Sequence, residues 1–166
     1  MKKRNRNRQH GKRQSGFSLI ELLIVISVIL LIAGISIPSL IQSRMRGNEA
    51  SAVGSLRQMA TSSLAFQVQC SDVGYESTLT LLGPGGGDCA SGANLLDSVL
   101  GGSASPQKAG YAFTFTGDGQ TPSIAFTISA DPISGYSGTR HFFIDQSGVV
   151  RENDTATATI ADQPIQ

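Results

Sequence analysis

Residues 17–37 read FSLIELLIVISVILLIAGISI, and this stretch decides how the chain is organised. As a helix, 21 residues rise about 32 Å, which is enough to cross the hydrocarbon core of a membrane. The only ionisable side chain in the stretch is Glu21, close to its N-terminal end, and Pro38 follows its last residue. The stretch therefore predicts a hydrophobic, membrane-spanning helix over residues 17–38.

The basic residues lie almost entirely on one side of this stretch. Residues 1–16 contain seven Lys/Arg and no Asp/Glu, within a chain of 166 residues that has 13 Lys/Arg, 12 Asp/Glu and a formal charge of +1. Residues 17–166 therefore carry six basic and twelve acidic side chains, a balance of −6. A basic flank keeps its end of a span in the cytoplasm, so we expect the chain after Pro38 to be exported. The acidic balance of the exported part argues against nucleic-acid binding.

Three interpretations of the apolar stretch remain open at this point. A cleaved secretory signal has a shorter apolar core and a small-x-small cleavage site, which Ile32-Ala33-Gly34 matches poorly. A plain signal anchor accepts the length, although a carboxylate at the bilayer centre would cost about 2.5–3.5 kcal/mol, and less near the interface. The third interpretation is cleavage between Gly16 and Phe17, which makes Glu21 the fifth residue of the mature chain.

The sequence SGFSLIELL at residues 15–23 resembles the processing site of type IV prepilins and of the related pseudopilins of type II secretion. The resemblance rests on the basic leader, on Gly16 before the cut and Phe17 after it, on Glu21, and on the long apolar helix. It implies that a prepilin peptidase removes residues 1–16 and that the amine of Phe17 is N-methylated. It is most like a short bacterial type IV pilin, and a pseudopilin is the alternative.

Three residues of the apolar stretch are candidates for a role in assembly. Intramembrane carboxylates need a partner, and we expect Glu21 to meet the Phe17 amine of a neighbouring subunit and so set the axial register. The alternative is a solvated carboxylate at the interface. Pro38 clashes with the carbonyl group four residues earlier, at Gly34, so this segment should kink or unwind during assembly. An ordinary kink without a role in assembly is equally compatible with the sequence.

Residues 39–69 continue as an amphipathic helix. Its apolar residues recur mostly at steps of three or four; they are Ile41, Met45, Ala52, Leu56, Met59 and Phe66. Small residues between them would let neighbouring helices approach closely. Arg44, Arg46 and Glu49 form a charged patch, which either is a solvated face or matches charges between subunits.

The remainder changes from helical patterns to strands and turns. Residues 70–109 are a connecting region, and we expect a short helix near 94–100. The two cysteines of this region, Cys70 and Cys89, predict a disulfide in an exported chain. The alternative is that both are free buried thiols. Residues 110–152 predict three or four antiparallel strands, at 111–116, 123–129, 140–144 and 149–151. Residues 153–166 form a polar tail. The expected fold class is α+β, with the long N-terminal helix packed against this small sheet.

Recognisable catalytic chemistry is absent from the sequence. Of its two histidines, His10 lies in the leader and His141 in a predicted strand, and neither belongs to a metal-ligand spacing. The glycine run at residues 83–87 lacks the Lys-Ser/Thr of a phosphate-binding loop. We therefore expect no enzyme activity, no catalytic residues, no cofactor and no metal.

The sequence predicts a structural subunit of a type IV pilus-like filament. The alternatives are a type II secretion pseudopilin and a signal-anchored periplasmic domain that does not polymerise. The expected partners are other copies of the chain, other pilins, the prepilin peptidase and the inner-membrane assembly machinery. The precursor would lie in the inner membrane, and the assembled subunit at the cell surface.

Overall fold

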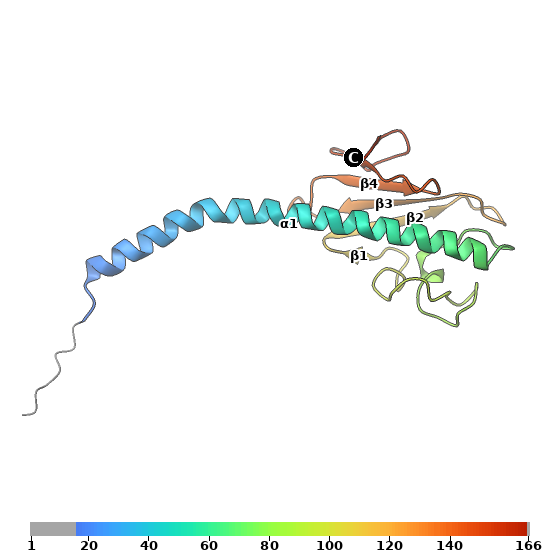
Figure 1. Ribbon diagram of the computed structural model, residues 1–166, viewed down its shortest axis with the longest axis horizontal. Coiled ribbons are helices and arrows are strands. Elements are labelled where there is room, and N and C mark those ends of the chain that lie inside the picture. Colours follow the sequence, from blue (N-terminus) through green and yellow to red (C-terminus); the bar gives the residue numbers. More distant parts are fainter. Residues whose placement is uncertain (1–15, 166) are drawn as a thin grey trace, which may run out of the picture. The chain divides into compact units, whose positions relative to one another are not determined.

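A single long helix, α1 (Leu19–Gln69), forms the N-terminal part of the computed structural model, which describes residues 16–165 (Figure 1). The carbonyl group of Ser18 accepts hydrogen bonds from the backbone N–H groups of Glu21 and Leu22, at 3.1 and 3.2 Å, and starts the helix. The helix continues without interruption through Pro38. The chain divides into two compact units after Ser39, so α1 contributes to both.

The second unit contains one six-stranded antiparallel sheet in which each strand pairs with the next along the chain. Figure 1 shows strands β1 to β4 beside the second half of α1. The strands are β1 (Gln107–Lys108), β2 (Tyr111–Gly117), β3 (Phe126–Pro132), β4 (His141–Asp145), β5 (Arg151–Asn153) and β6 (Gln163–Pro164). The pairing of β2 with β3 is the longest and runs from Tyr111 opposite Pro132 to Gly117 opposite Phe126. The α+β class and the antiparallel sheet are confirmed.

The sheet has more strands than the sequence predicts. Strands β2 to β5 overlap the four predicted strands, but β3 begins three residues later than predicted and β5 shares only Arg151 with the strand predicted at 149–151. The additional strands β1 and β6 are two residues each, and they lie in the predicted connecting region and the predicted polar tail. Segments this short carry no detectable alternation of polar and apolar residues, so they escape a search based on periodicity.

The prediction of a short helix near residues 94–100 is wrong. Asn94 has a φ of +57°, which a right-handed helix does not accommodate, and residues 98–100 form a turn. The Asp97 carboxylate accepts hydrogen bonds from the backbone N–H groups of Val99 and Leu100, at 3.1 and 2.9 Å. Such local side-chain bonds compete with helix formation. The connecting region instead contains a 3-10 helix, η1 (Leu79–Leu81).

The core of the second unit lies between α1, the sheet and the connecting region. From α1 it takes Leu56, Met59 and Phe66, all fully buried, as the amphipathic pattern predicts. The same pattern placed Ile41 on the buried face, but this side chain is 37% exposed. The other fully buried large side chains come from the strands and from the connecting region; they are Tyr111, Phe113, Phe126, Ile128, Phe142 and Ile144, and Leu79, Leu82 and Leu100.

Backbone contacts fasten the start of the connecting region to the β2–β3 loop. Ser123 accepts a hydrogen bond from the backbone N–H of Tyr75 at 3.1 Å, and its own N–H donates to the carbonyl group of Val73 at 2.8 Å. Gly74, between them, has a φ of +82°, and a Cβ atom there would lie 2.1 Å from the Ser123 carbonyl oxygen. This close approach therefore requires glycine.

Candidate functional site

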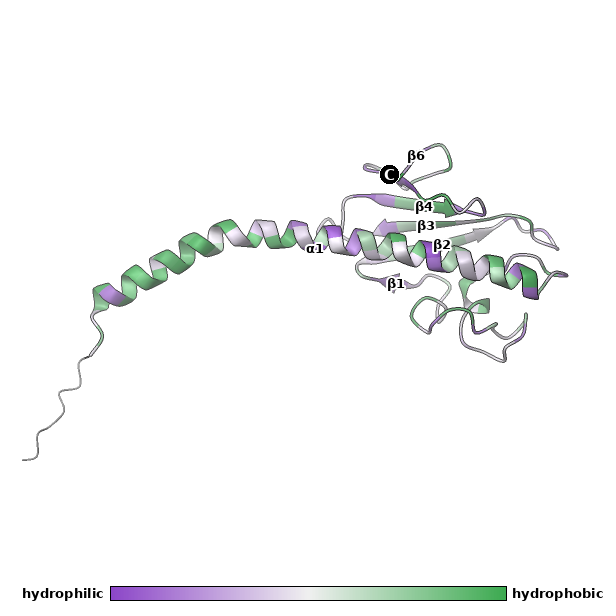
Figure 2. Cartoon of the chain, in the orientation of Figure 1, coloured by the Kyte–Doolittle hydropathy of each residue, from purple (hydrophilic) through white to green (hydrophobic). Residues whose placement is uncertain are grey.

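The first half of α1 exposes its apolar side chains all round. No residue of its most apolar 18-residue window is buried, and Figure 2 shows that most residues along this half of the helix are hydrophobic. In the part of the chain that the structure describes, α1 is the one helix long and apolar enough to cross a membrane, by length and composition. Burial in lipid or against other helices would remove this surface from water.

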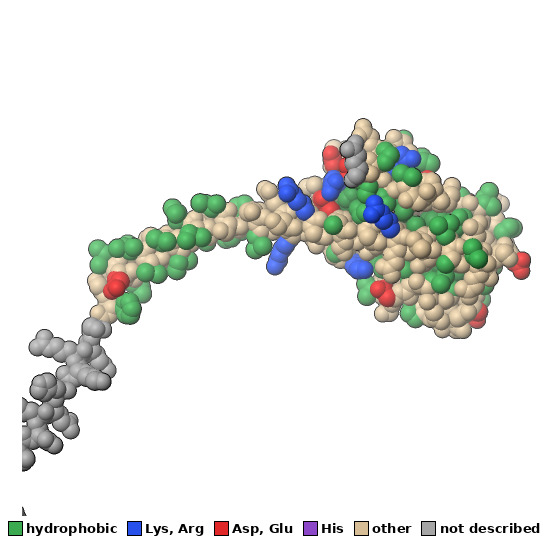
Figure 3. Space-filling model, viewed as in Figure 1, with side chains coloured by type: hydrophobic (Ala, Val, Ile, Leu, Met, Phe, Trp, Pro, Cys, Tyr) green, Lys and Arg blue, Asp and Glu red, His purple; other side chains and the backbone are tan. Residues whose placement is uncertain are grey.

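The predicted processing site lies immediately before α1. Gly16 and Phe17 precede the helix and are exposed, with Phe17 85% accessible, so the peptide bond between them is open to a peptidase. Glu21 lies in the first turn of α1 and is exposed. Figure 3 shows hydrophobic side chains along this half of the helix, with acidic side-chain atoms near its N-terminal end. Carboxylates are favoured at this end of a helix by the helix dipole. Its side chain forms no hydrogen bond or ion pair with another described residue in this single subunit.

The segment from Gly34 to Pro38 is helical in the subunit. A Cβ atom at Gly34 would have open space around it, so the packing of this single chain does not require glycine there. Proline inside a helix removes a hydrogen bond and costs about 3 kcal/mol, so Pro38 weakens this part of the helix. Unwinding of the segment during assembly stays a prediction.

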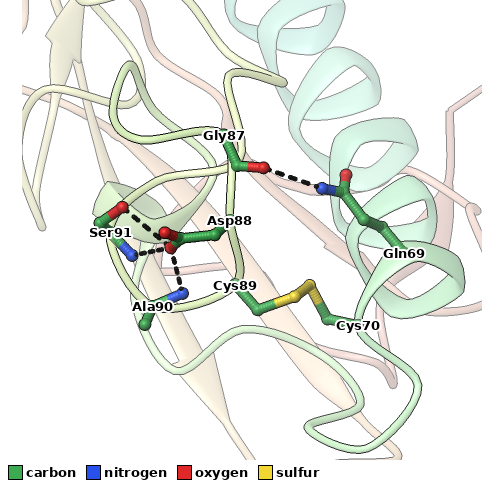
Figure 4. Close-up of a disulfide and its surroundings, with 7 residues drawn as sticks. All are labelled: Gln69, Cys70, Gly87, Asp88, Cys89, Ala90 and Ser91. Atoms are coloured by element: carbon green, nitrogen blue, oxygen red, sulfur yellow. Dashed lines mark hydrogen bonds between the residues drawn. A yellow bond between two sulfur atoms is a disulfide. The ribbon is translucent and has the colours of Figure 1, made fainter.

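The predicted disulfide is present. Cys70, the first residue after α1, is bonded to Cys89, with their Cα atoms 5.9 Å apart (Figure 4). The loop around Cys89 is ordered by Asp88, whose carboxylate accepts hydrogen bonds from the backbone N–H groups of Ala90 and Ser91, at 2.9 and 2.6 Å. These bonds, with one from the Ser91 hydroxyl, lower the pKa of Asp88. The disulfide therefore ties an organised loop to the end of α1.

The three residues predicted to form a charged patch on α1 do not share one environment, because Glu49 is buried and the two arginines are exposed. Glu49 is only 5% exposed and accepts hydrogen bonds on one carboxylate oxygen from Nε and Nη2 of Arg140, at 3.0 and 2.8 Å. Its other oxygen accepts from the backbone N–H of Thr139 at 3.1 Å. Nη1 of Arg140 donates to Glu152 on β5 at 2.6 Å. Glu49 thus joins α1 to the sheet within one subunit and is not on a solvated face, whereas Arg44 and Arg46 are exposed.

Hydrogen bonds determine the ionisation of Glu49. Burial on its own raises the pKa of this carboxyl, but the bond from Thr139 and the bonds and charge of Arg140 outweigh burial and hold the pKa below its usual value. Glu49 is therefore ionised at neutral pH, and Arg140 balances its charge. The burial of Glu49 has a weak signal in the sequence, because a carboxylate three residues before the buried Ala52 falls on the inner face of the helix.

The donor sets that bind metal ions in proteins are groups of His, Cys, Asp and Glu side chains. In residues 16–165, no group of three or more His, Cys, Asp or Glu side chains is placed to hold a metal ion. His141 pairs with Asp131 across β4 and β3, with Nδ1 2.5 Å from a carboxylate oxygen. We assign no chemical role to this pair.

One comparison with known proteins gives a match. Residues 7–37 match the family described as the prokaryotic N-terminal methylation motif, the prepilin motif of type IV pilins and pseudopilins. The matched segment contains the predicted cleavage site, Glu21 and Gly34, and its first part lies outside the described residues. No curated protein and no solved structure matches the chain.

Proposed function

We propose that this chain, which carries the prokaryotic N-terminal methylation motif, is a structural subunit of a type IV pilus-like filament. In this proposal a prepilin peptidase cuts between Gly16 and Phe17, and the new amine of Phe17 is methylated. One observation carries the proposal: the exposed apolar helix that begins just after this bond is continuous with the helix of a folded, disulfide-bonded unit. The role is structural and not enzymatic.

Polymerisation would transfer the first half of α1 from lipid into a bundle of identical helices. Lipid is as apolar as the side chains of such a bundle, so the hydrophobic effect contributes little to this step. Helix packing and polar pairing must then provide selectivity. Glu21 is suited to this role because its carboxylate is exposed in the single subunit, within the first turn of the helix. Pairing with the Phe17 amine of a neighbour would compensate both charges and fix the register.

The proposal also places the chain in the cell. The seven Lys/Arg residues of the leader would hold the precursor in the inner membrane with its N-terminus in the cytoplasm and residues 40–166 in the periplasm. The assembled filament would extend from the cell surface. The partners would be other copies of the chain and other pilins, the prepilin peptidase and the inner-membrane assembly machinery.

Two measurements test the proposal. The intact mass of the exported protein should correspond to a chain that begins at methylated Phe17, and a retained leader, Met1–Gly16, would contradict it. Electron microscopy of sheared surface material should show filaments that are lost when the protein is deleted. A correctly processed chain without filaments, whose deletion instead stops protein secretion, would identify the pseudopilin alternative.

A further inference from the structure

Glu76 is a carboxyl group enclosed in the second unit without a neighbouring positive charge. The residue is 0% exposed and lies between the disulfide-bonded Cys70 and η1. None of the ion pairs formed by the described residues includes it. An isolated carboxylate in such surroundings loses its hydration without compensation, and a group in this position tends to stay neutral.

The hydrogen bonding around Glu76 also favours a protonated acid. The hydroxyl oxygen of Ser63, on α1, lies 2.5 Å from Oε1 of Glu76 and 3.0 Å from the carbonyl oxygen of Met59. A serine hydroxyl has one hydrogen and can donate to only one of these oxygens. If Glu76 is protonated, it donates to Ser63, and Ser63 donates to Met59, so both contacts are hydrogen bonds. If Glu76 is ionised, one of them is lost.

The second oxygen of the carboxyl group supports the same conclusion. Oε2 of Glu76 is buried and has no hydrogen-bond partner among the described residues. For a neutral acid this oxygen is an unsatisfied carbonyl, which has a modest cost. For an ionised acid it carries part of a full charge, and the cost of leaving it without a donor is larger.

The described residues that line the hollow beside Glu76 include no positively charged group. The hollow beside Glu76 is lined by residues from 73–77 and 117–123, among which Tyr75 and Glu76 are the titratable ones. Burial and then the charge of Glu76 raise the pKa of Tyr75. The nearby charges in sequence, Asp72 on the same segment and Asp118 on the β2–β3 loop, are acidic. On α1, the residue that contacts Glu76 is the uncharged Ser63. The charged residue closest to Ser63 along this helix is Arg57, which is exposed.

We propose that Glu76 makes the stability of the second unit depend on pH. As a neutral acid it attaches residues 70–78 to α1, and its ionisation weakens this attachment and destabilises the second unit. The disulfide at Cys70 and the backbone bonds between Tyr75 and Ser123 keep the segment near its place. Ionisation therefore weakens the packing of the segment without releasing it. This inference does not depend on the proposed filament function, since it concerns the folded unit of a single subunit.

The direction of the pH dependence follows from burial. Burial, opposed by weaker effects of hydrogen bonding, raises the pKa of Glu76 from 4.5 to about 7. A folded-state pKa above the unfolded-state value means that the stabilisation is complete below the unfolded value. It is lost as the pH rises from there through about 7. This is opposite to the behaviour of a carboxylate in an ion pair.

The test compares urea unfolding of the full chain in detergent micelles at pH 5 and pH 8, followed by tyrosine fluorescence. Glu76→Gln keeps the shape of the side chain, can donate from its amide to Ser63, and does not titrate. Between these pH values the unfolding constant of the wild type should rise on the order of 50- to 100-fold more than that of Glu76→Gln. The control Asp72→Asn, at an exposed carboxylate, should follow the wild type.

A second measurement is independent of unfolding. Carbon-13 NMR of glutamate-labelled chain, with Glu76→Gln to assign the signal, should show the Glu76 carboxyl titrating near neutral pH. A titration in the ordinary range of glutamate, near 4.3, would overturn the proposal. So would equal pH dependence of unfolding in the wild type and Glu76→Gln.

Discussion

The contact between Glu49 and Arg140 should stabilise the attachment of α1 to the sheet. Replacing the arginine should therefore lower the free energy of unfolding. In Arg140→Ala, the carboxylate of Glu49 stays buried and keeps the bond from the Thr139 backbone, but it loses both bonds from the guanidinium group. In Glu49→Gln, the charge disappears, while Arg140 keeps its bond to Glu152 and its access to water. The two variants should therefore differ in cost.

The expected cost follows from the exposure of each partner. Removing one partner of a buried ion pair costs about 3–5 kcal/mol, because the other charge is left uncompensated. The side chain of Arg140 is 40% exposed and that of Glu49 only 6%, so water can enter the space that the arginine leaves and screen part of the charge. We expect Arg140→Ala to lower the free energy of unfolding by about 2–3 kcal/mol and Glu49→Gln by about 1 kcal/mol.

The two variants should also respond differently to pH. In the wild type, the pKa of Glu49 is lowered overall, so its contribution to stability is present above the ordinary glutamate range and is lost as the pH falls through the folded-state value. Without Arg140, burial dominates, and the pKa of Glu49 should rise above its unfolded-state value. The deficit of Arg140→Ala relative to the wild type should then shrink on acidification.

Urea unfolding of the full chain in detergent micelles, at pH 7 and pH 4, measures these effects. The double variant completes a thermodynamic cycle, and we expect a coupling energy of at least about 1 kcal/mol. Arg57→Ala, at an exposed arginine of the same helix, is the matched control and should change stability by less than about 0.5 kcal/mol. If Arg140→Ala costs no more than Arg57→Ala, or if its deficit grows at pH 4, the explanation given for this contact is wrong.

Three further predictions concern other parts of the chain. Replacing Cys70 and Cys89 together by serine should lower the free energy of unfolding by about 3 kcal/mol in urea titrations; unchanged stability would contradict a stabilising role. Glu21→Ala should insert into membranes normally but fail to form filaments, as checked by membrane fractionation and electron microscopy; normal filaments would reject the register role. Gly74→Ala should cost at least about 2 kcal/mol in the same urea assay, and more than Gly119→Ala, which shares a positive φ but has open space around it; equal costs would mean that the close backbone approach is unimportant.

Much of the fold could be predicted because its elements repeat a simple pattern over many residues. The apolar run of α1 extends over several helical turns, and the alternation of buried and less buried residues in β2 extends over three residue pairs. The repeat of each element is therefore visible in the sequence. The short strands β1 and β6 have no such repeat. They form because the neighbouring strands present free backbone groups for pairing.

The error at residues 94–100 has a different origin. Asn94 and Asp97 are both compatible with a helix in composition, but each is also suited to a turn. The backbone of Asn94 is left-handed, and Asp97 bonds to two N–H groups that follow it. A choice between two locally acceptable conformations depends on the packing of Leu96 and Leu100 into the core, which local patterns do not specify.

Some residues of the candidate site could be predicted from the sequence, and others could not. Gly16, Phe17 and Glu21 could be identified because their spacing is a contiguous motif, and the match to the methylation family covers them. The partner of Glu49 could not be identified, because Arg140 lies 91 positions along the chain from Glu49. Distant contacts of this kind depend on strand register.

Two buried glutamates of the second unit show why residue type alone does not determine charge. Glu49 and Glu76 are both glutamates almost without access to water, and both contact α1 or lie on it. Glu49 has an arginine and a backbone N–H as donors, which favour the ionised form, whereas Glu76 has a single shared hydroxyl, which favours the neutral form. Acidification therefore weakens the first contact, and alkalinisation weakens the second. Since the two effects oppose each other, the attachment of α1 to the rest of the unit should be strongest at mildly acidic pH, above the folded-state value of Glu49 and below that of Glu76, about 7.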